Sequence, residues 1–179
     1  AKGQYHYFFP EHDLDHKLNP AGPNHETIAS LTGISDYLDA LYAHHFTDST
    51  KSRFERTRLL FQLFAEYEEK LAQHFLEFIN SETSIRLIGT TRAELNARVP
   101  TFSLQINGVP SDQVAQALAK EGIACGSGHF YAKRLLDSLN IWEPEVLRCS
   151  MAHYTSLSDV DRLISTLKRQ IPAQTRPIR

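Results

Sequence analysis

Apolar residues in the first half of the chain recur at spacings of three and four. Residues 1–23 are broken by prolines and glycines and predict irregular structure. From Asn24, an expected N-cap, to about residue 45 runs one apolar helical face made of Ile28, Leu31, Ile34, Leu38 and Leu41. A longer pattern predicts a helix over residues 50–80, with a buried stripe of Phe54, Leu60, Phe61, Phe64, Tyr67, Leu71, Phe75 and Phe78.

The second half changes to the alternating pattern that is typical of strands. Strands are predicted at residues 85–88, 101–106, 123–125 and 146–151. The helix signals are an N-cap at Ser111, a C-terminal Gly122, an apolar run of Phe130, Leu135, Leu136 and Leu139, and a capping box of Ser158 and Asp161. Together these patterns predict an α+β fold: a helical segment followed by a small domain whose three- or four-stranded sheet is covered by helices.

Composition narrows the classes of function. The net charge of −2 and the lack of a basic block argue against nucleic-acid binding. No apolar run has the length of a membrane span, and no signal peptide is visible. Cys125 and Cys149 have no CxxC spacing, which predicts two reduced, mostly buried thiols in a cytoplasmic protein. The only methionine is Met151, which suggests a cut through a longer protein, although removal of an initiator methionine would give the same start.

Two features stand out as candidate chemistry. The run from Gly126 to Tyr131 is predicted at a strand-to-helix junction, where it could hold an anion, shape an active-site loop, or simply form a tight turn. Arg148 lies in the middle of an apolar strand. Its planar fork suits a carboxylate, but an internal salt bridge or an exposed edge position would also explain it.

Two further clusters have a weaker basis. The run from His153 to Ser156 follows the last strand and is better explained as a turn and helix cap than as a site. The N-terminal acidic and histidine residues include Zn²⁺ ligand types, but no helix is predicted to align them, so a metal site is not favoured; they are His6, Glu11, His12, Asp13, Asp15 and His16.

In order and spacing, these segments resemble the C-terminal part of class V aminotransferases and cysteine desulfurase-like enzymes, which depend on pyridoxal phosphate (PLP). The resemblance covers nearly the whole chain. The matching segments are Lys17 to Glu26, Asp36 to Leu41, Tyr67-Glu68, Arg98 to Ser103, Gly122 to Ala124, Gly128 to Ala132, Arg148, Ala152 to Tyr154 and Asp159 to Leu163.

The resemblance implies that the chain is part of the fold type I α/β PLP-transferase architecture. Residues 1–45 would be the tail of the large PLP domain, 46–83 a connecting helix, 84–171 the small domain and 172–179 a frayed tail. It also implies a cytoplasmic homodimer acting on a small amino acid.

The same resemblance implies roles for five residues. Arg148 would bind the substrate carboxylate, and His129 and Tyr131 would line the closing lid. Gly22 and Asn24 stand where many members place a glycine and a threonine that reaches the PLP phosphate of the partner subunit.

Two departures from the family pattern limit the expected activity. Tyr131 replaces the cysteine that carries a persulfide in sulfur-transferring members, so a transaminase, lyase or epimerase is expected instead. The PLP lysine has no match, because no apolar strand leads into His16-Lys17; it is expected upstream, and this fragment alone is expected to bind no PLP and to be inactive. The alternatives are a standalone ligand-binding or regulatory module and a structural dimerisation piece.

Overall fold

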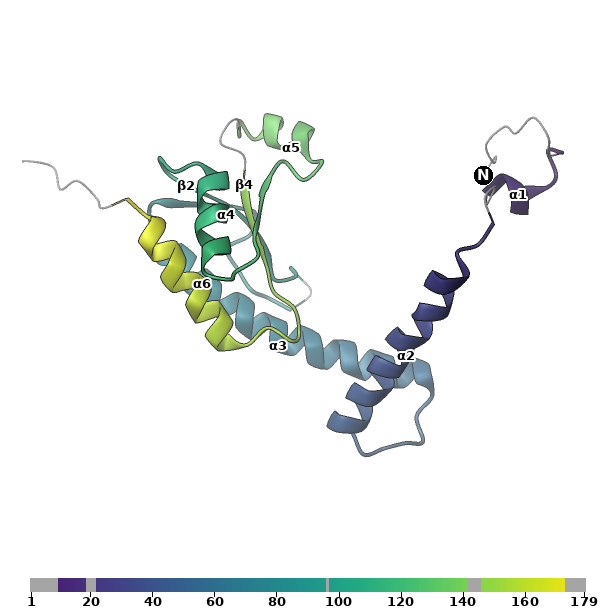
Figure 1. Ribbon diagram of the computed structural model, residues 1–179. Helices are drawn as coiled ribbons and strands as arrows, with labels where there is room; N and C mark the ends of the chain where they lie inside the picture. The colour runs from purple at the N-terminus through teal and green to yellow at the C-terminus, as the bar shows by residue number, and fades with distance from the viewer. Residues whose placement is uncertain (1–9, 19–21, 96, 142–145, 173–179) are drawn as a thin grey trace, which may run out of the picture. The chain divides into compact units, whose positions relative to one another are not determined.

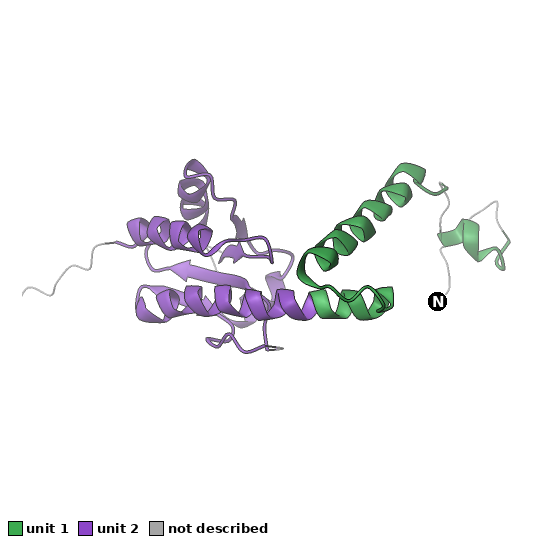
Figure 2. Ribbon diagram, turned by 90° about the horizontal axis from the view of Figure 1, so that it is seen from below, with its two compact units in different colours: residues 1–60 green, residues 61–179 purple. Residues whose placement is uncertain are grey.

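The computed structural model describes residues 10–18, 22–95, 97–141 and 146–172 (Figure 1). The chain divides into two compact units, residues 1–60 and 61–179, which are coloured separately in Figure 2. Among the described residues, no helix combines the length and the apolar character that crossing a membrane requires.

Unit 1 is helical. It contains α1 (Leu14–Leu18), α2 (His25–His45) and the first part of α3 (Arg53–Ser81). The prediction of wholly irregular structure before residue 24 is wrong at α1, a single turn that begins where Asp13 accepts a hydrogen bond from the backbone N–H of His16. The predicted cap of α2 is confirmed, because Asn24 Oδ1 accepts a hydrogen bond from the backbone N–H of Thr27 at 2.8 Å.

Polar contacts connect the end of α2 to the start of α3 within unit 1. The buried Tyr42 donates its hydroxyl hydrogen bond to the backbone oxygen of Asp48 at 2.8 Å. Asp39 pairs with Arg53 at 3.0 Å and with Arg56 at 3.3 Å. These contacts fix the loop between the two helices.

The burial of apolar residues on these helices differs from the prediction. Phe54 and Phe61 of the expected buried stripe are 73% and 58% exposed. The helical period of 3.6 residues places Phe54 and Phe61 on the apolar side of this 29-residue helix, but other described residues pack against only part of that side. The more C-terminal members of the stripe are buried as predicted; they are Leu71, Phe75 and Phe78.

Unit 2 is built on a four-stranded antiparallel sheet. Its strands are β1 (Ile85–Ile88), β2 (Thr101–Ile106), β3 (Gly126–Gly128) and β4 (Val146–Ser150), in the order β1-β2-β4-β3. The sequence places β1 and β2 correctly and β4 to within one residue.

The position predicted for the third strand is wrong by three residues. Residue Ile123 is held by the preceding helix, because its backbone N–H donates to the oxygen of Leu118 at 3.0 Å. Gly122, at φ +73°, allows the reversal that this bond requires. Pairing with β4 therefore begins only at Gly126.

One face of the sheet forms the main core of unit 2. Phe102, Leu104 and Ile106 alternate on this face and are buried beneath α3, α4 (Ser111–Lys120) and α6 (Leu157–Gln170). The ring of Phe75 meets that of Phe102 edge-on at 4.9 Å. As Figure 1 shows, α4 and α6 pack side by side, which makes the α+β layering that the sequence predicts.

Three local predictions in unit 2 need correction. Ser111 is the first helical residue of α4, and Pro110 takes the N-cap position. The capping box of α6 is Ser156 with Asp159 instead of Ser158 with Asp161, because the chain leaves its turn at Thr155. The helix expected around Phe130 and Leu139 is the six-residue α5 (Lys133–Ser138), which contains neither residue and buries only Leu136.

Candidate functional site

The face of the sheet that does not form the main core carries polar side chains. Residues directly opposite each other in an antiparallel pair point to the same face. Arg148 of β4 stands opposite Ser103 of β2 on one side and Gly126 of β3 on the other. Two pairs along, and so on the same face, Arg86 of β1 stands opposite Gln105. The predicted carboxylate-binding arginine therefore projects from this polar face in the middle of the sheet.

The Arg148 guanidinium lies over an aromatic ring. Its Cζ is 3.9 Å from the centroid of the Phe130 ring, and the side chain is exposed. No acidic residue of the described part of the chain pairs with it. Of the three explanations that the sequence leaves open for Arg148, an internal salt bridge is not observed among these residues.

Phe130 belongs to a tight turn that directly follows β3. The backbone N–H of Ala132 donates to the oxygen of His129 at 2.8 Å, and Phe130 and Tyr131 between them have φ angles of 47° and 60°. Two positive φ angles define a type I′ turn, which glycine and asparagine ordinarily occupy. Two bulky aromatic residues in this conformation are strained, and such strain is concentrated at functional sites.

His129 holds this turn through its imidazole ring. Its Nδ1 accepts a hydrogen bond from the backbone N–H of Tyr131 at 3.0 Å, which leaves Nε2 as the ring atom that can carry the proton. The Tyr131 side chain is fully exposed and lies edge-on to the His129 ring. The structure thus brings Arg148 together with the turn that holds His129 and Tyr131.

The loop after β4 is a packed turn and helix cap. His153 stacks on Phe64 with a centroid distance of 4.0 Å. The oxygen of Thr155 accepts a hydrogen bond from the hydroxyl of Tyr67 at 2.9 Å, and Ser156 caps α6. The favoured explanation of this run as turn and cap is confirmed.

Residues of unit 1 that the resemblance singles out have local roles there. Gly22 has a φ of +78°, and the Asn24 side chain caps α2. Within the described residues, no three His, Cys, Asp or Glu side chains gather closely enough to bind a metal, and His6 lies outside those residues.

The described residues do not supply an anchor for PLP. Lys17 lies in the single turn of α1, not at the end of a strand. The lysines of unit 2 all lie on helices, where Lys133 pairs with Asp137 at 2.9 Å and Lys168 lies over the ring of Phe78. In unit 1, Lys51 pairs with Asp48 at 3.1 Å, so none of the described lysines is assigned to the Schiff base.

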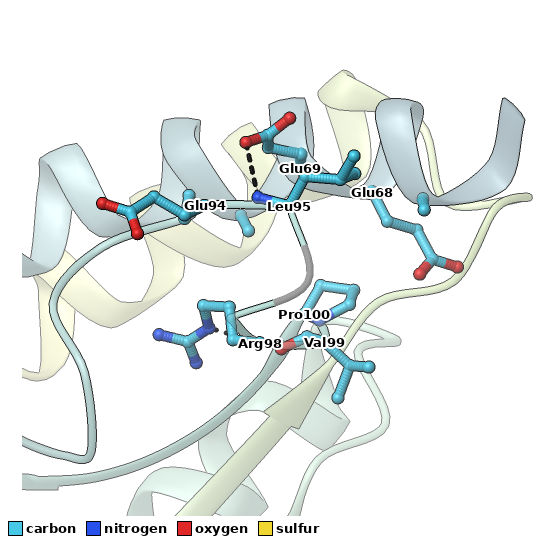
Figure 3. Close-up of a pocket in the computed structure, with 10 residues that line it drawn as sticks. Glu68, Glu69, Glu94, Leu95, Arg98, Val99 and Pro100 are labelled. Atoms are coloured by element: carbon cyan, nitrogen blue, oxygen red, sulfur yellow. Dashed lines mark hydrogen bonds between the residues drawn. The ribbon is translucent and has the colours of Figure 1, made fainter. Parts of the chain in front are cut away.

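A cavity of about 170 Å³ lies between α3 and the loop that leads into β2 (Figure 3). Its polar groups serve the fold: Glu69 accepts the backbone N–H of Leu95 at 2.8 Å, and Arg98 donates to the oxygens of Thr90 and Thr101, both at 2.8 Å. The Cζ atom of Arg98 also lies 4.1 Å from the centroid of the Phe102 ring. Burial lowers the pKa of the Arg98 guanidinium. Arg148 does not line this cavity. Because Glu69 and Arg98 in its wall form hydrogen bonds that hold the loop in place, we interpret the cavity as a gap in the packing and not as a binding site.

The two cysteines form a contact that the sequence does not predict. Their Sγ atoms are 3.6 Å apart, with Cys149 buried and Cys125 partly exposed. The hydrogen bond from Cys149 lowers the pKa of Cys125 against the opposing effect of burial, and the same bond together with burial raises the pKa of Cys149. Cys125 is thus the more reactive thiol.

The sequence of the chain is similar to that of known proteins. Residues 53–163 match the family model "Aminotransferase class-V". The "Aminotransferase-like protein FGM3" of Gibberella zeae is 29% identical over 165 residues, covering 91% of this chain and 37% of that protein. A "Probable cysteine desulfurase" of Staphylococcus aureus is 33% identical over 112 residues, covering 63% of this chain and 26% of that protein. The chain therefore spans about a third or less of the length of these relatives.

Solved structures show the same fold. A cysteine desulfurase of Thermococcus onnurineus aligns with a TM-score of 0.58 and 21% identity, over 66% of this chain and 28% of its own. The cysteine desulfurase CsdA of Escherichia coli aligns with a TM-score of 0.50 and 26% identity, over 59% and 24%. The predicted fold class, an α+β piece of the PLP-transferase fold, is confirmed. With more than half of its length matched by the family model, the chain belongs to the aminotransferase class-V family.

Proposed function

We propose that this chain is the C-terminal, substrate-closing part of a class-V PLP enzyme that acts on a small amino acid. The observation that carries the proposal is Arg148, an exposed guanidinium without an acidic partner among the described residues, beside the strained turn of His129 and Tyr131. A guanidinium with free N–H groups binds a carboxylate in two-point fashion. Arg148 therefore binds and orients the α-carboxylate of the substrate.

The division of labour along the chain is part of the proposal. Residues 1–45 are the tail of the large domain, 46–83 the connecting helix, 84–171 the small domain and 172–179 a tail. Support comes from the exposed apolar face of α2, where Ile28, Leu31 and Ile34 are 54%, 56% and 58% exposed. An amphipathic helix with an uncovered apolar face is stabilised by packing against further protein.

The cofactor is bound by other parts of the full-length protein. The family depends on PLP, which supplies an electron sink when bound. Because this chain contains no matching lysine, we infer that it is inactive by itself. Gly22 and Asn24 are candidates to approach the phosphate in a homodimer, and the location is cytoplasmic.

The identity of residue 131 restricts the reaction. A tyrosine cannot carry a persulfide, which requires a thiolate. Transamination, elimination or epimerisation is therefore favoured over sulfur transfer. His129, with Nε2 able to donate, and Tyr131 line the lid of the site and exclude water from it.

The test compares Arg148→Ala with Arg86→Ala in the protein expressed together with the coding sequence upstream of residue 1. Arg86 is a matched control, since it lies on the same sheet face but donates to the backbone oxygen of Leu139. Arg148→Ala should weaken amino-acid binding roughly 10- to 150-fold and leave the absorbance of bound PLP unchanged, while Arg86→Ala should change neither. Equal effects of the two variants on affinity, or loss of PLP absorbance with unchanged affinity, would refute the proposal.

One observation favours a second candidate, a standalone ligand-binding module. Unit 2 has its own buried core, formed by α3, the sheet, α4 and α6. Calorimetry of the 179-residue chain with amino acids, in the absence of PLP, discriminates between the two. Tight and saturable binding would support the module, whereas the class-V proposal expects weak but carboxylate-dependent binding, because the other half of the site is missing.

A further inference from the structure

Among the described residues, the contact between Phe130 and Arg148 is the one cation–π contact on the polar face of the sheet. A cation over an aromatic face is attracted by the ring quadrupole. The N–H donors of a guanidinium lie in its plane, so a ring beneath that plane leaves its edges free. At 3.9 Å from the ring centroid, the Arg148 guanidinium is supported from one side and remains open to a planar anion.

The Phe130 ring lies directly against a glycine. A Cβ added at Gly126 would come within 3.1 Å of Cε1 and 3.2 Å of Cζ of this ring, a contact tight enough that the ring would have to move by a few tenths of an ångström. Gly126 is also the residue of β3 that stands directly opposite Arg148. The ring therefore lies against the backbone of Gly126, a residue without a side chain, and next to Arg148.

Two further features hold the ring in place. Phe130 packs against a small apolar cluster of Leu136, Ile141 and Val146. Its own backbone is in the left-handed region at φ 47°, a conformation that costs a bulky residue free energy. Asparagine or glycine would satisfy the turn with less strain. A phenylalanine here indicates that its ring has a purpose beyond forming the turn.

We propose that Phe130 is a positioning residue for Arg148, and that Gly126 is required to admit its ring. This inference rests on the proposed function, because it concerns how the carboxylate-binding group is held. An exposed arginine otherwise loses side-chain conformational entropy when it binds a ligand. The ring restricts the guanidinium beforehand, so that less entropy is lost on binding.

The inference predicts different outcomes for three substitutions. Phe130→Tyr keeps the aromatic face and should preserve the position of Arg148. Phe130→Leu keeps apolar packing with the cluster but removes that face. Gly126→Ala leaves Phe130 in the sequence but pushes its ring by a few tenths of an ångström, and should therefore weaken the contact with Arg148 less than Phe130→Leu does. A ring needed only for packing would make Phe130→Leu resemble the parent chain.

The experiment records the Nε–Hε resonance of Arg148 in the ¹⁵N-labelled 179-residue chain, assigned by its loss in Arg148→Lys. The ring current of Phe130 should shift Hε in the parent chain and in Phe130→Tyr, less in Gly126→Ala, and not in Phe130→Leu. L-Alanine is then titrated, with L-alaninamide, which lacks the carboxylate, as the control ligand. The affinity for L-alanine should fall roughly two- to fivefold in Phe130→Leu, the effect of an exposed cation–π contact.

The carboxylate-binding role of Arg148 and the positioning role of Phe130 can be refuted separately. If L-alanine and L-alaninamide shift the parent resonance alike, the carboxylate role of Arg148 fails, and the ring-current pattern alone still decides whether Phe130 holds the guanidinium. If the parent chain binds L-alanine selectively and Phe130→Leu shows the same resonance and affinity, the positioning inference is overturned. Should Phe130→Leu not fold, the comparison of Phe130→Tyr with Gly126→Ala gives the same decision.

Discussion

Mild oxidation of the chain should join Cys125 and Cys149. The Sγ atoms are 3.6 Å apart. Continuing the register in which Gly126 stands opposite Arg148 places the two cysteines opposite each other, one residue beyond the ladder of β3 and β4. Directly opposed residues of antiparallel strands have Cα separations within the range that disulfides accept. The geometry therefore allows a bond without a shift of either strand.

The chemistry balances with a small disulfide such as oxidised glutathione. The Cys125 thiolate, favoured by its lowered pKa, attacks the oxidant, releases one glutathione and forms a mixed disulfide. Deprotonated Cys149 then attacks the Cys125 sulfur and releases the second glutathione. Two thiols are oxidised and one glutathione disulfide is reduced.

The magnitude follows from the loop that the bond closes. The cysteines are 24 residues apart, and a loop of this length corresponds to about 3.5 kcal/mol of stabilisation through the unfolded state. For a unit of this size, about 4 °C per kcal/mol gives a rise in Tm of roughly 14 °C. Strain in the folded state would reduce this value.

The assay combines intact mass, a count of free thiols and calorimetry with and without reductant. Oxidised chain should have lost two hydrogens, carry no glutathione and melt higher, and reductant should reverse all three changes. Cys125→Ser is the control, since it cannot form the bond and its melting should be insensitive to oxidant. A stable glutathione adduct on Cys125 of the parent chain, without the internal bond, would refute the contact and the register on which it depends.

Two further predictions concern the stability of unit 2. Ser156→Ala should lower the unfolding free energy by about 1 kcal/mol at neutral pH, measured by urea denaturation, because the α6 cap is lost. The hydrogen bonds that Ser156 donates to the Asp159 carboxylate hold the pKa of Asp159 below its ordinary value of 3.8, so the part of the cap that involves this carboxylate is present above that pH and is lost as the pH falls below it. The effect of Ser156→Ala should therefore be smaller at acidic pH, and an equal effect there would contradict this role of the carboxylate. Phe75→Ala should cost roughly 3–5 kcal/mol, because its ring is fully buried against Phe102, whereas truncation of the exposed Phe61 on the same helix should cost about 0.5 kcal/mol or less; similar losses would contradict the observed packing.

Hydrophobic periodicity predicts a helix or strand well where its position depends on the local sequence alone. The helical face after Asn24 and the alternation of Phe102, Leu104 and Ile106 place α2 and β2 correctly. The third strand is missed because its position depends on pairing with β4, and Gly126 has no strand preference of its own. Local sequence does not contain that information.

The capping box of α6 shows a different limit. Ser156 to Asp159 and Ser158 to Asp161 are both Ser-x-x-Asp, so the sequence pattern is satisfied twice. The turn that precedes the helix selects the first of them, because the backbone N–H of Thr155 is bonded to the oxygen of Ala152 at 2.8 Å. Which of two equal signals is used is decided by the incoming chain.

The sequence predicts one residue of the candidate site and misses another. Arg148 is predictable because a charged residue in an apolar strand is unusual. Phe130 is not, because the sequence assigns it to the apolar face of a helix, whereas the structure places it in a type I′ turn. Its partner Arg148 is far away in the sequence and is brought near only by the sheet.

The strained turn links these observations to how the site is held. Two bonds to His129 fix it: its backbone oxygen accepts from Ala132, and its Nδ1 accepts from the N–H of Tyr131. A bulky residue keeps a left-handed backbone conformation only where surrounding contacts hold it there. Here the two hydrogen bonds to His129 hold both Phe130 and Tyr131 in this conformation. The same imidazole that fixes the ring of Phe130 over Gly126 thus presents Nε2 beside an exposed Tyr131. Under the proposed function, holding the arginine and shaping the lid would therefore be one structural task, carried out by four consecutive residues.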